Sequence, residues 1–329
     1  MKTLRTSLSF TRSLLLLAPL ALTATIASAQ GYPTRPIEWV VPYPAGGGSD
    51  VVARSLTDAM GKLLGQTIII NNKPGAATNI GADYVAHAKP DGYTILTGDT
   101  ATLGANPALY SKLSYSAEKD LAPIGLLARF PMILVVNPAV PVKNLAEFMA
   151  WAKTQKAGVS YATPGAGSPH HLATELFRVK SGLNLVHVPY RGAAPAVQDV
   201  AGGQLPFMFV DTASGMGFIN SGRLRAIGIA SPKRVKNFES IPTLDEQGMK
   251  GFEAYAWQGL VAPAGTPEDV IAKLNKALVD ALNSTPVKAR FQVLGLEPTP
   301  STPAHMATYA SAERKKWAEV IRTSGIKLD

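Results

Sequence analysis

Cysteine is absent from the 329 residues of this chain. Its absence excludes disulfide bonds, a lipid-modified cysteine and any metal site with cysteine ligands. The folded chain therefore depends on the packing of its core for stability. A chain of this length can build a large core, and it is long enough for two domains.

Long apolar runs are also missing, because no stretch is long and apolar enough to span a bilayer comfortably. The most apolar segment, residues 14–22, lies near the N-terminus behind several basic residues. It is followed by Ala27-Ser28-Ala29, a small-residue cleavage site. This pattern predicts a signal peptide over residues 1–29 that is cleaved before Gln30, and hence an exported mature protein.

Clusters of basic residues interleaved with aromatic ones are absent, so binding of nucleic acid is not expected. The formal net charge is +9, and the predicted signal peptide carries basic residues but no acidic ones. After its removal a charge of about +6 remains, a moderate excess that attracts anionic solutes.

The common motifs of nucleotide-binding and hydrolytic enzymes are absent. No Gly-Lys-Ser/Thr follows a glycine loop, Gly165–His170 fails the dinucleotide pattern at its last position, and there is no G-x-S-x-G elbow. Ser168, His171 and Asp211 could form a hydrolytic triad, but Ser168 is better suited to capping a helix. The sequence favours a binding protein over an enzyme, and no cofactor is expected.

A metal site is not expected either. His170, His171 and Glu175 put two types of ligand on one predicted helical turn. However, adjacent histidines on a helix point in different directions, and no H-E-x-x-H motif is present. We expect one of these histidines to line a binding cleft and the other to pack or to face solvent.

Strand and helix patterns alternate along the mature chain, which favours an α/β fold with mostly parallel sheets. Two extended segments, 124–137 and 255–262, interrupt the alternation. We interpret them as crossings between two lobes. The first lobe would comprise residues 30–130 and 260–329, with the closing helices packed against it, and the second lobe residues 131–259.

A first glycine loop, Pro42-Tyr43-Pro44-Ala45-Gly46-Gly47-Gly48, follows a predicted strand and precedes a predicted helix over residues 49–64. Ser49 is a natural N-cap for that helix. Glycines leave the backbone amides open to a ligand, and a helix N-terminus favours negative charge. The pattern is typical of an anion site, although a tight strand–helix turn without a ligand would have the same sequence.

The second half of the chain repeats this arrangement. A second glycine loop, Thr163-Pro164-Gly165-Ala166-Gly167-Ser168, joins a strand to a helix that has Pro169 at its first position. Val188-Pro189-Tyr190 also repeats the Val41-Pro42-Tyr43 that leads into the first loop. Ligands of open α/β sheets bind at the carboxyl ends of strands. Two such loops predict a cleft that holds an anion at both ends, as a dicarboxylate would fit.

Other side chains near the loops have more than one interpretation. Arg191 either clamps a carboxylate or is solvated, and Tyr43 and Tyr190 are either walls of the cleft or ordinary loop aromatics. Asp50 and Asp211 would repel an anion, so we expect each to accept backbone hydrogen bonds and to order its loop.

Six segments, taken together and in order, carry a resemblance to a known family. They are Tyr32-Pro33-Thr34-Arg35-Pro36-Ile37, residues 41–50, Asn72-Lys73-Pro74-Gly75-Ala76, Pro90-Asp91-Gly92-Tyr93-Thr94, residues 187–192 and Phe209-Val210-Asp211. In combination they resemble the Bug family, the extracytoplasmic solute receptors of tripartite tricarboxylate transporters. The resemblance covers essentially the whole mature chain.

The resemblance implies a two-lobed periplasmic binding protein fold, type II-like, with two crossing strands and closure around a carboxylate ligand. It implies delivery of that ligand, in the periplasm, to a membrane transporter with a large and a small subunit, and we expect the receptor to be a monomer. Relatives often have Ser or Asn after the third strand, where this chain has Thr97-Gly98-Asp99-Thr100. Asp99 is therefore expected to alter how the far end of the ligand is recognised.

The resemblance also implies that both glycine loops hold the ligand, with ordered waters bridging to the protein. The candidate ligand-binding residues are Tyr43, Ala45, Gly46, Gly47, Gly48, Ser49, Thr97, Asp99, Thr163, Gly165, Ala166, Gly167, Ser168, His171, Tyr190 and Asp211. Two alternatives stay open: a receptor of the same fold that presents its ligand to a sensor kinase, and a secreted α/β hydrolase that uses Ser168 and His171.

Overall fold

The computed structural model describes Thr3, residues 31–236 and residues 238–328. The predicted signal peptide and its cleavage site lie outside the described residues, apart from Thr3. Tyr32–Asp329 forms one compact unit, and the fold below is that of this unit. Within the described residues, no helix combines the length and the apolar character that crossing a membrane requires.

The strands follow one hydrogen-bonded path, β2-β1-β3-β9-β4-β7-β5-β6, which β4 divides into a first and a second sheet. In the first sheet, β1 (Ile37–Val41) lies between β2 (Ile68–Asn72) and β3 (Thr94–Asp99) and is parallel to both. Apart from Glu38, β1 is a buried apolar run, as expected of a parallel strand covered on both faces.

In the second sheet, β5 (Val159–Thr163) pairs in parallel with β6 (Leu185–Pro189) and with β7 (Phe207–Asp211). The strand β8 (Arg225–Ile229) pairs with β4. The first glycine loop follows β1, and the second follows β5. The carboxyl ends of these inner parallel strands therefore carry the two candidate loops.

The strands β4 (Leu121–Val136) and β9 (Tyr255–Pro263) are the two predicted crossings. β4 pairs with β9 as far as Pro131 and with β7 and β8 from Met132 onward, so one strand of 16 residues serves both sheets. All these pairings are antiparallel, as is that of β9 with β3. The prediction of mostly parallel sheets holds for β1, β2 and β3 and for β5, β6 and β7, whereas the pairings of β4 and β9 are antiparallel because the chain leaves along β4 and returns along β9.

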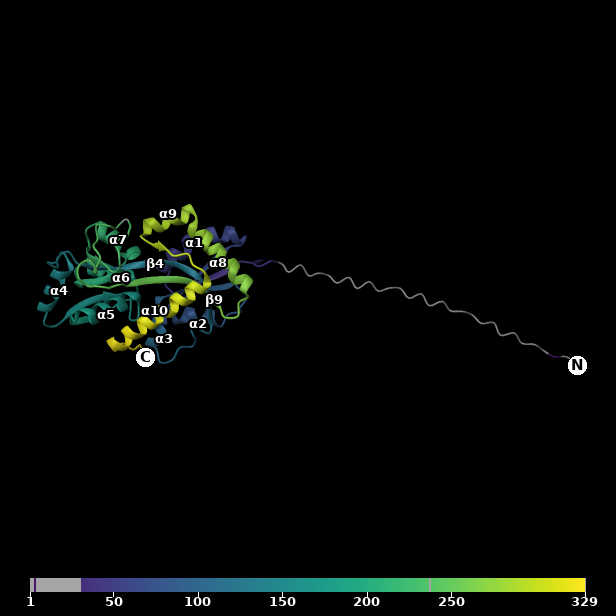
Figure 1. Ribbon diagram of the computed structural model, residues 1–329, viewed down its shortest axis with the longest axis horizontal. Coiled ribbons are helices and arrows are strands. Elements are labelled where there is room, and N and C mark those ends of the chain that lie inside the picture. Colours follow the sequence, from purple (N-terminus) through teal and green to yellow (C-terminus); the bar gives the residue numbers. More distant parts are fainter. Residues whose placement is uncertain (1–2, 4–30, 237, 329) are drawn as a thin grey trace. The chain divides into compact units, whose positions relative to one another are not determined.

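Helices cover both sheets, and clusters of buried apolar residues form the core between the helices and the sheets. Figure 1 shows α4, α5, α6 and α7 at one end of the unit and α1, α8 and α9 toward the other. The helices are α1 (Gly48–Leu64), α2 (Asn79–Ala86), α3 (Asn106–Leu109), α4 (Leu145–Thr154), α5 (Pro169–Ser181), α6 (Ala193–Ala201), α7 (Thr212–Asn220), α8 (Glu268–Asn283), α9 (Thr285–Leu294) and α10 (Pro303–Ser324), and the short strand β10 (Glu297–Pro298) pairs with β4.

The last helix, α10, contacts the cores of both sheets. Met306 and Ala310 pack in a cluster with Trp257 of β9, whereas Trp317 and Ile321 pack in the cluster of the second sheet. The sequence places the closing helices against the first lobe alone, and the second half of α10 departs from that expectation because its apolar face meets the second-sheet core. The exact boundaries of the two lobes stay a prediction.

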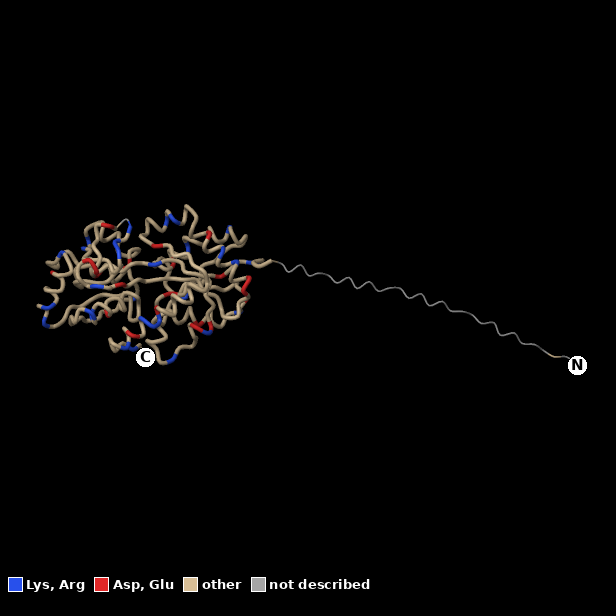
Figure 2. Tube along the Cα trace, viewed as in Figure 1, with Lys and Arg blue, Asp and Glu red and all other residues tan. Residues whose placement is uncertain are grey.

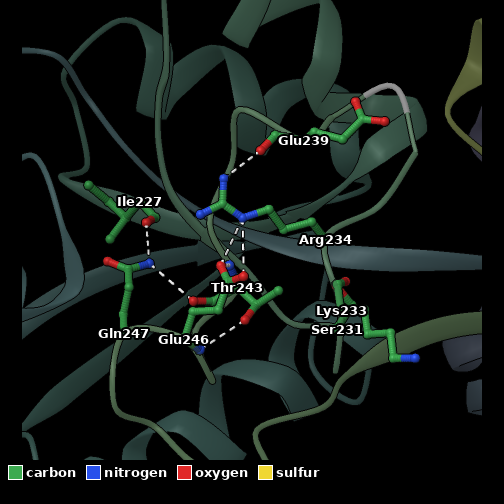
Figure 3. Close-up of polar contacts among 8 residues, drawn as sticks. All are labelled: Ile227, Ser231, Lys233, Arg234, Glu239, Thr243, Glu246 and Gln247. Carbon is green, nitrogen blue, oxygen red and sulfur yellow. Dashed lines mark hydrogen bonds and ion pairs between the residues drawn. The ribbon is translucent and has the colours of Figure 1, made fainter.

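The segment that leads from β8 back to β9 is fixed by polar contacts (Figure 3). Arg234 Nε donates to both carboxylate oxygens of Glu246 over 3.1 and 3.0 Å, and its Nη1 donates to the Glu239 carbonyl over 2.7 Å. Glu246 also accepts the Thr243 amide over 2.9 Å. Gln247 Nε2 donates to the Ile227 carbonyl of β8 over 2.8 Å, which joins the segment to the second sheet.

Charged residues are distributed over the whole unit. Figure 2 shows Lys and Arg interspersed with Asp and Glu along the trace of the described residues. This distribution agrees with the scattered basic residues of the sequence.

Candidate ligand-binding site

The first glycine loop joins β1 to α1 and leaves α1 without a side-chain cap. Gly47 occupies the N-cap position in an extended conformation, with φ −76° and ψ 168°. Ser49, predicted as the N-cap, lies inside the first turn, and its Oγ accepts a hydrogen bond of 2.6 Å from Nε2 of Gln258 on β9. The N-cap prediction is wrong because Gly47 already has the extended backbone that the cap position requires.

The amides of the first loop are partly engaged and partly open. Gly46 N–H donates to Asp50 Oδ2 over 2.8 Å, and Gly47 N–H donates to the Pro44 carbonyl over 3.4 Å. The amides of Gly48 and Ser49 have no acceptor in the part of the chain that the structure describes. They begin a helix of 17 residues, whose dipole favours an anion at this end. The open donors are thus at the start of α1, directly after the exposed residues 45–47 in the chain.

Asp50 orders the first loop, as the sequence predicts. Besides the Gly46 amide, Oδ2 accepts Arg54 Nε over 2.9 Å, and Oδ1 accepts Asn72 Nδ2 over 3.0 Å. Burial alone would raise the pKa of Asp50, but these hydrogen bonds hold the pKa below its ordinary value. The carboxylate therefore stays charged while it fixes the loop from inside.

Tyr43 and Asp99 form a hydrogen-bonded pair. The Tyr43 hydroxyl donates to Asp99 Oδ2, and Asp99 Oδ1 accepts the Thr102 amide over 2.9 Å. Asp99 lies opposite Gln258 in the β3–β9 pairing, so the pair adjoins the contact between Gln258 and Ser49. Burial raises the pKa of Asp99, although hydrogen bonds from Tyr43 and Thr102 oppose the rise.

Thr97 lies in the core of the first sheet. Its Oγ1 accepts a hydrogen bond of 2.8 Å from Nε1 of Trp39, and both side chains are fully buried. The Thr97 hydroxyl is therefore engaged by Trp39, and the role of Thr97 in ligand binding stays a prediction.

The cap of α5 agrees with the sequence. Ser168 Oγ accepts the His171 amide over 3.3 Å, and Pro169 takes the first helical position. Because Ser168 is used in this way, its hydroxyl supports the helix that follows the second glycine loop.

The second glycine loop is held from inside by two histidines. Gly167 N–H donates to Nδ1 of His171 over 3.1 Å. Gly165 N–H donates to Oγ1 of Thr163 over 3.2 Å, and that oxygen lies 2.6 Å from Nε2 of His187. The Ala166 amide has no acceptor among the described residues.

Asp211 forms a buried pair with His170. The Asp211 carboxylate lies 3.0 Å from His170 Nε2 and accepts the Ser214 amide over 2.9 Å, so it also caps α7. Burial would raise the pKa of Asp211, but the His170 hydrogen bond and charge and the Ser214 amide lower it overall. The expectation that Asp211 orders its loop is confirmed.

The hydrolytic triad is not assembled. Asp211 pairs with His170 rather than with His171, and the His171 ring is engaged by Gly167 and stacks on His187. The Ser168 hydroxyl accepts only a backbone amide among the contacts of the described residues. Within those residues, no group of His, Asp and Glu has an arrangement that could hold a metal ion.

Tyr190 and Arg191 lie at the end of β6. The Tyr190 hydroxyl donates to Asp199 Oδ2 on α6 over 2.6 Å, and its ring packs partly buried on the apolar cluster of that helix. Arg191 is exposed, which is compatible with both of its interpretations.

The candidate residues form two networks, one in each sheet. The first comprises the Tyr43–Asp99 pair and the Ser49–Gln258 pair, which are neighbours because Asp99 lies opposite Gln258 in the β3–β9 pairing. The second joins Thr163, Gly167 and His171 through His187. Gln258 and the role of His187 are not predicted from the sequence. The sequence signal for Gln258 is that it is a polar residue inside the otherwise apolar strand β9.

Comparisons with known proteins identify relatives of this chain. A family model described as the tripartite tricarboxylate transporter family receptor matches residues 52–326. BugT of Bordetella pertussis is 35% identical over 325 residues, which are 98% of this chain and 100% of BugT.

Solved structures are similar as well. MatC from Rhodopseudomonas palustris, solved with bound malate, is 35% identical with a TM-score of 0.81, covering 88% of this chain and 100% of MatC. An R. palustris protein solved with adipate is 31% identical with a TM-score of 0.85, covering 90% of this chain and 99% of that protein. From the extent of these matches, the chain belongs to the tripartite tricarboxylate transporter receptor family, the Bug solute-binding receptors, and has their two-lobed periplasmic binding protein fold.

Proposed function

We propose that this protein is a periplasmic receptor for a small organic carboxylate, with a dicarboxylate as the favoured class. The observation that carries the proposal is the uncapped start of α1, where the amides of Gly48 and Ser49 have no acceptor among the described residues. Hydrogen bonds from such donors to a carboxylate are charge-assisted, and each contributes about 1.5–3 kcal/mol.

The two loops have unequal parts in this proposal. The start of α1 offers two adjacent open donors, which match the two oxygens of one carboxylate. The second glycine loop offers the Ala166 amide, because its other amides at Gly165, Gly167 and Ser168 already have acceptors. We therefore assign the main carboxylate contact to the first loop and a supporting contact to the second.

Closure of two lobes would bring these donors to one ligand. We assign residues 30–130 and 260–329 to the first lobe and residues 131–259 to the second, with β4 and β9 as the connections. The related MatC and R. palustris structures hold malate and adipate, and both compounds are dicarboxylates. We further assign to the receptor the delivery of its ligand to a membrane transporter with a large and a small subunit, and the family description supports this assignment.

A thermal-shift screen of ligand-stripped protein tests the binding function. The panel should contain malate, adipate, citrate and benzoate, together with uncharged amides of the same acids. A ligand at 100 times its dissociation constant adds about 2.7 kcal/mol to the free energy of unfolding. The proposal expects at least one acid to raise the melting temperature and its amide to have no effect, and stabilisation by the amides alone would contradict it.

A pull-down with the immobilised, ligand-loaded receptor distinguishes the membrane partners. Recovery of the transporter subunits supports the delivery function, whereas recovery of a sensor kinase in their place would assign the protein to ligand presentation. The hydrolase alternative has no assembled triad to support it.

A further inference from the structure

The second glycine loop depends on the protonation state of a buried histidine. Gly167 N–H is a backbone donor and can only donate, so Nδ1 of His171, 3.1 Å away, must carry a free lone pair. This contact requires His171 to be neutral, with its proton on Nε2. The imidazole is buried, so it contacts the loop from the protein interior.

A second histidine supports the first. The rings of His171 and His187 stack with centroids 3.9 Å apart and an angle of 12° between planes, and the Tyr161 ring lies 5.1 Å from His187 and 6.3 Å from His171. His187 Nε2 lies 2.6 Å from Thr163 Oγ1, which accepts the Gly165 amide. The stacked pair therefore supports the loop at both of its glycines.

The surroundings keep this pair neutral. Burial, then the neighbouring His187, then Arg178 lower the pKa of His171 to about 3, and burial lowers the pKa of His187 although Glu175 opposes this. Glu175 accepts hydrogen bonds of 2.7 Å from both Tyr161 and Arg178, so its charge is compensated locally. The nearby pair of His170 and Asp211 makes its own hydrogen bond.

The loop has few other means of keeping its shape. Gly165 and Gly167 have φ of 145° and 76°, conformations that side chains rarely adopt. The space beside Gly167 is closed by Leu109 and Leu328, which lie under 3 Å from an added Cβ. The direction of the Ala166 amide is thus set by the glycine on each side of it and by the groups that hold those glycines.

We propose that His171 and His187 are positioning residues for ligand binding, which act by holding the second glycine loop so that the Ala166 amide faces the ligand. Neither histidine touches the ligand in this account. The inference rests on the proposed carboxylate function, because it assigns to the loop a ligand that the proposed function supplies.

Two substitutions at His171 separate hydrogen bonding from packing. His171→Asn keeps an acceptor near the position of Nδ1 but removes the ring, whereas His171→Phe keeps a stacking ring but removes the acceptor. The same substitutions at exposed His305 serve as matched controls. Affinity for malate and for adipate is measured by calorimetry at pH 7.5, and hydrogen exchange of the Gly167 amide is followed by NMR in the absence of ligand.

The expected result is a split between the two variants. His171→Asn should bind within about threefold of the wild type and keep the Gly167 amide protected, while His171→Phe should bind at least about tenfold more weakly and lose that protection. A His171→Phe variant with wild-type affinity would overturn the proposal, and so would a Gly167 amide that exchanges equally in all variants.

The outcomes also distinguish this proposal from the proposed function. If the wild type binds neither malate nor adipate, the dicarboxylate assignment loses its support, and exchange of the Gly167 amide still decides whether His171 holds the loop. If His171→Phe does not fold, His187→Gln replaces it, because it keeps a group near Nε2 for Thr163 while removing the stacking ring. Equal Gly167 protection and affinity in His187→Gln and the wild type would show that the second ring has no positioning role.

Discussion

Gly48 is the single residue on which the proposed carboxylate contact depends most directly. An added Cβ at Gly48 would meet no atom within 4 Å, and the backbone there does not have a positive φ. A larger side chain therefore fits the folded protein but covers the open amides at the start of α1. Gly46 is unsuitable for the same purpose because its φ of 81° makes any substitution strained.

We predict that Gly48→Val lowers affinity for the carboxylate by about 10- to 150-fold, equivalent to one lost charge-assisted hydrogen bond. The melting temperature of the unliganded protein should stay close to that of the wild type. Gly217→Val is the matched control, since Gly217 is an exposed helical glycine that also has open space beside it. Unchanged affinity in calorimetry would remove the start of α1 from the site.

A second prediction concerns the effect of low pH on stability through His171. Burial and its neighbours lower the folded-state pKa of His171 to about 3, below its ordinary value of 6.5. As pH falls below 6.5, His171 binds a proton in the unfolded chain but stays neutral in the folded protein. The free energy of unfolding therefore decreases down to about pH 3, by at most about 1.4 kcal/mol per pH unit.

Urea unfolding at pH 7, 6 and 5 measures this loss. The wild type should lose stability over the interval, and His171→Asn should show a smaller loss because its side chain does not titrate. The same pH dependence in both proteins would show that His171 is not the responsible group. The depressed pKa values of Asp50 and Asp211 act at lower pH, below the ordinary carboxylate value of 3.8.

At the scale of elements, the start of α1 is tied to the crossing strand β9. Ser49 on α1 and Gln258 on β9 are 209 residues apart in sequence and share a buried hydrogen bond of 2.6 Å. The Ser49 hydroxyl is the acceptor of the Gln258 Nε2 amide group. Gln258 Oε1 is buried and has no partner among the described residues. A buried donor without an acceptor costs about 1–3 kcal/mol.

Ser49→Ala should therefore lower the free energy of unfolding by about 1–3 kcal/mol. Gln258→Leu in addition should recover much of the loss, because it removes both unsatisfied polar atoms. A double-mutant cycle by urea unfolding measures the coupling. Additive effects of the two substitutions would mean that the contact does not join α1 to β9 energetically.

The elements predictable from sequence are those specified by local patterns. The apolar run of β1, the end of α1 near Leu64 and the Ser168–Pro169 start of α5 depend on residues adjacent in the chain, and the structure agrees with each. The local pattern predicts Ser49 as the cap because it does not distinguish Ser49 from Gly47. The Ser49–Gln258 and His171–His187 contacts, and the antiparallel crossing strands, depend on residues brought together only by folding.

At the scale of the whole folded unit, α10 connects the cores of the two sheets. Glu313 Oε2 accepts hydrogen bonds of 3.0 Å from Trp257 Nε1 and 2.8 Å from Trp317 Nε1, and these tryptophans belong to different apolar clusters. Together with β4 and β9, this helix limits the ways in which two lobes can move. Closure should thus be a bending at these three connections rather than a separation of independent domains.

Small-angle X-ray scattering with and without a saturating dicarboxylate tests this closure. We expect a smaller radius of gyration with ligand, because the two loops approach each other around it. Gly48→Val, titrated in parallel, should need about 10- to 150-fold more ligand than the wild type to reach the same decrease. Identical profiles for the liganded and unliganded wild type would contradict hinge motion.

The central claim is that the ligand is held through its carboxylate by open amides. Calorimetric titration of ligand-stripped protein with adipate and malate, and with adipamide and malamide, tests it directly, because each amide keeps the carbon skeleton of its acid and removes the negative charge. We predict that at least one acid binds and that its amide binds at least about 100-fold more weakly, the equivalent of about 2.7 kcal/mol. Equal affinity of acid and amide would contradict the account.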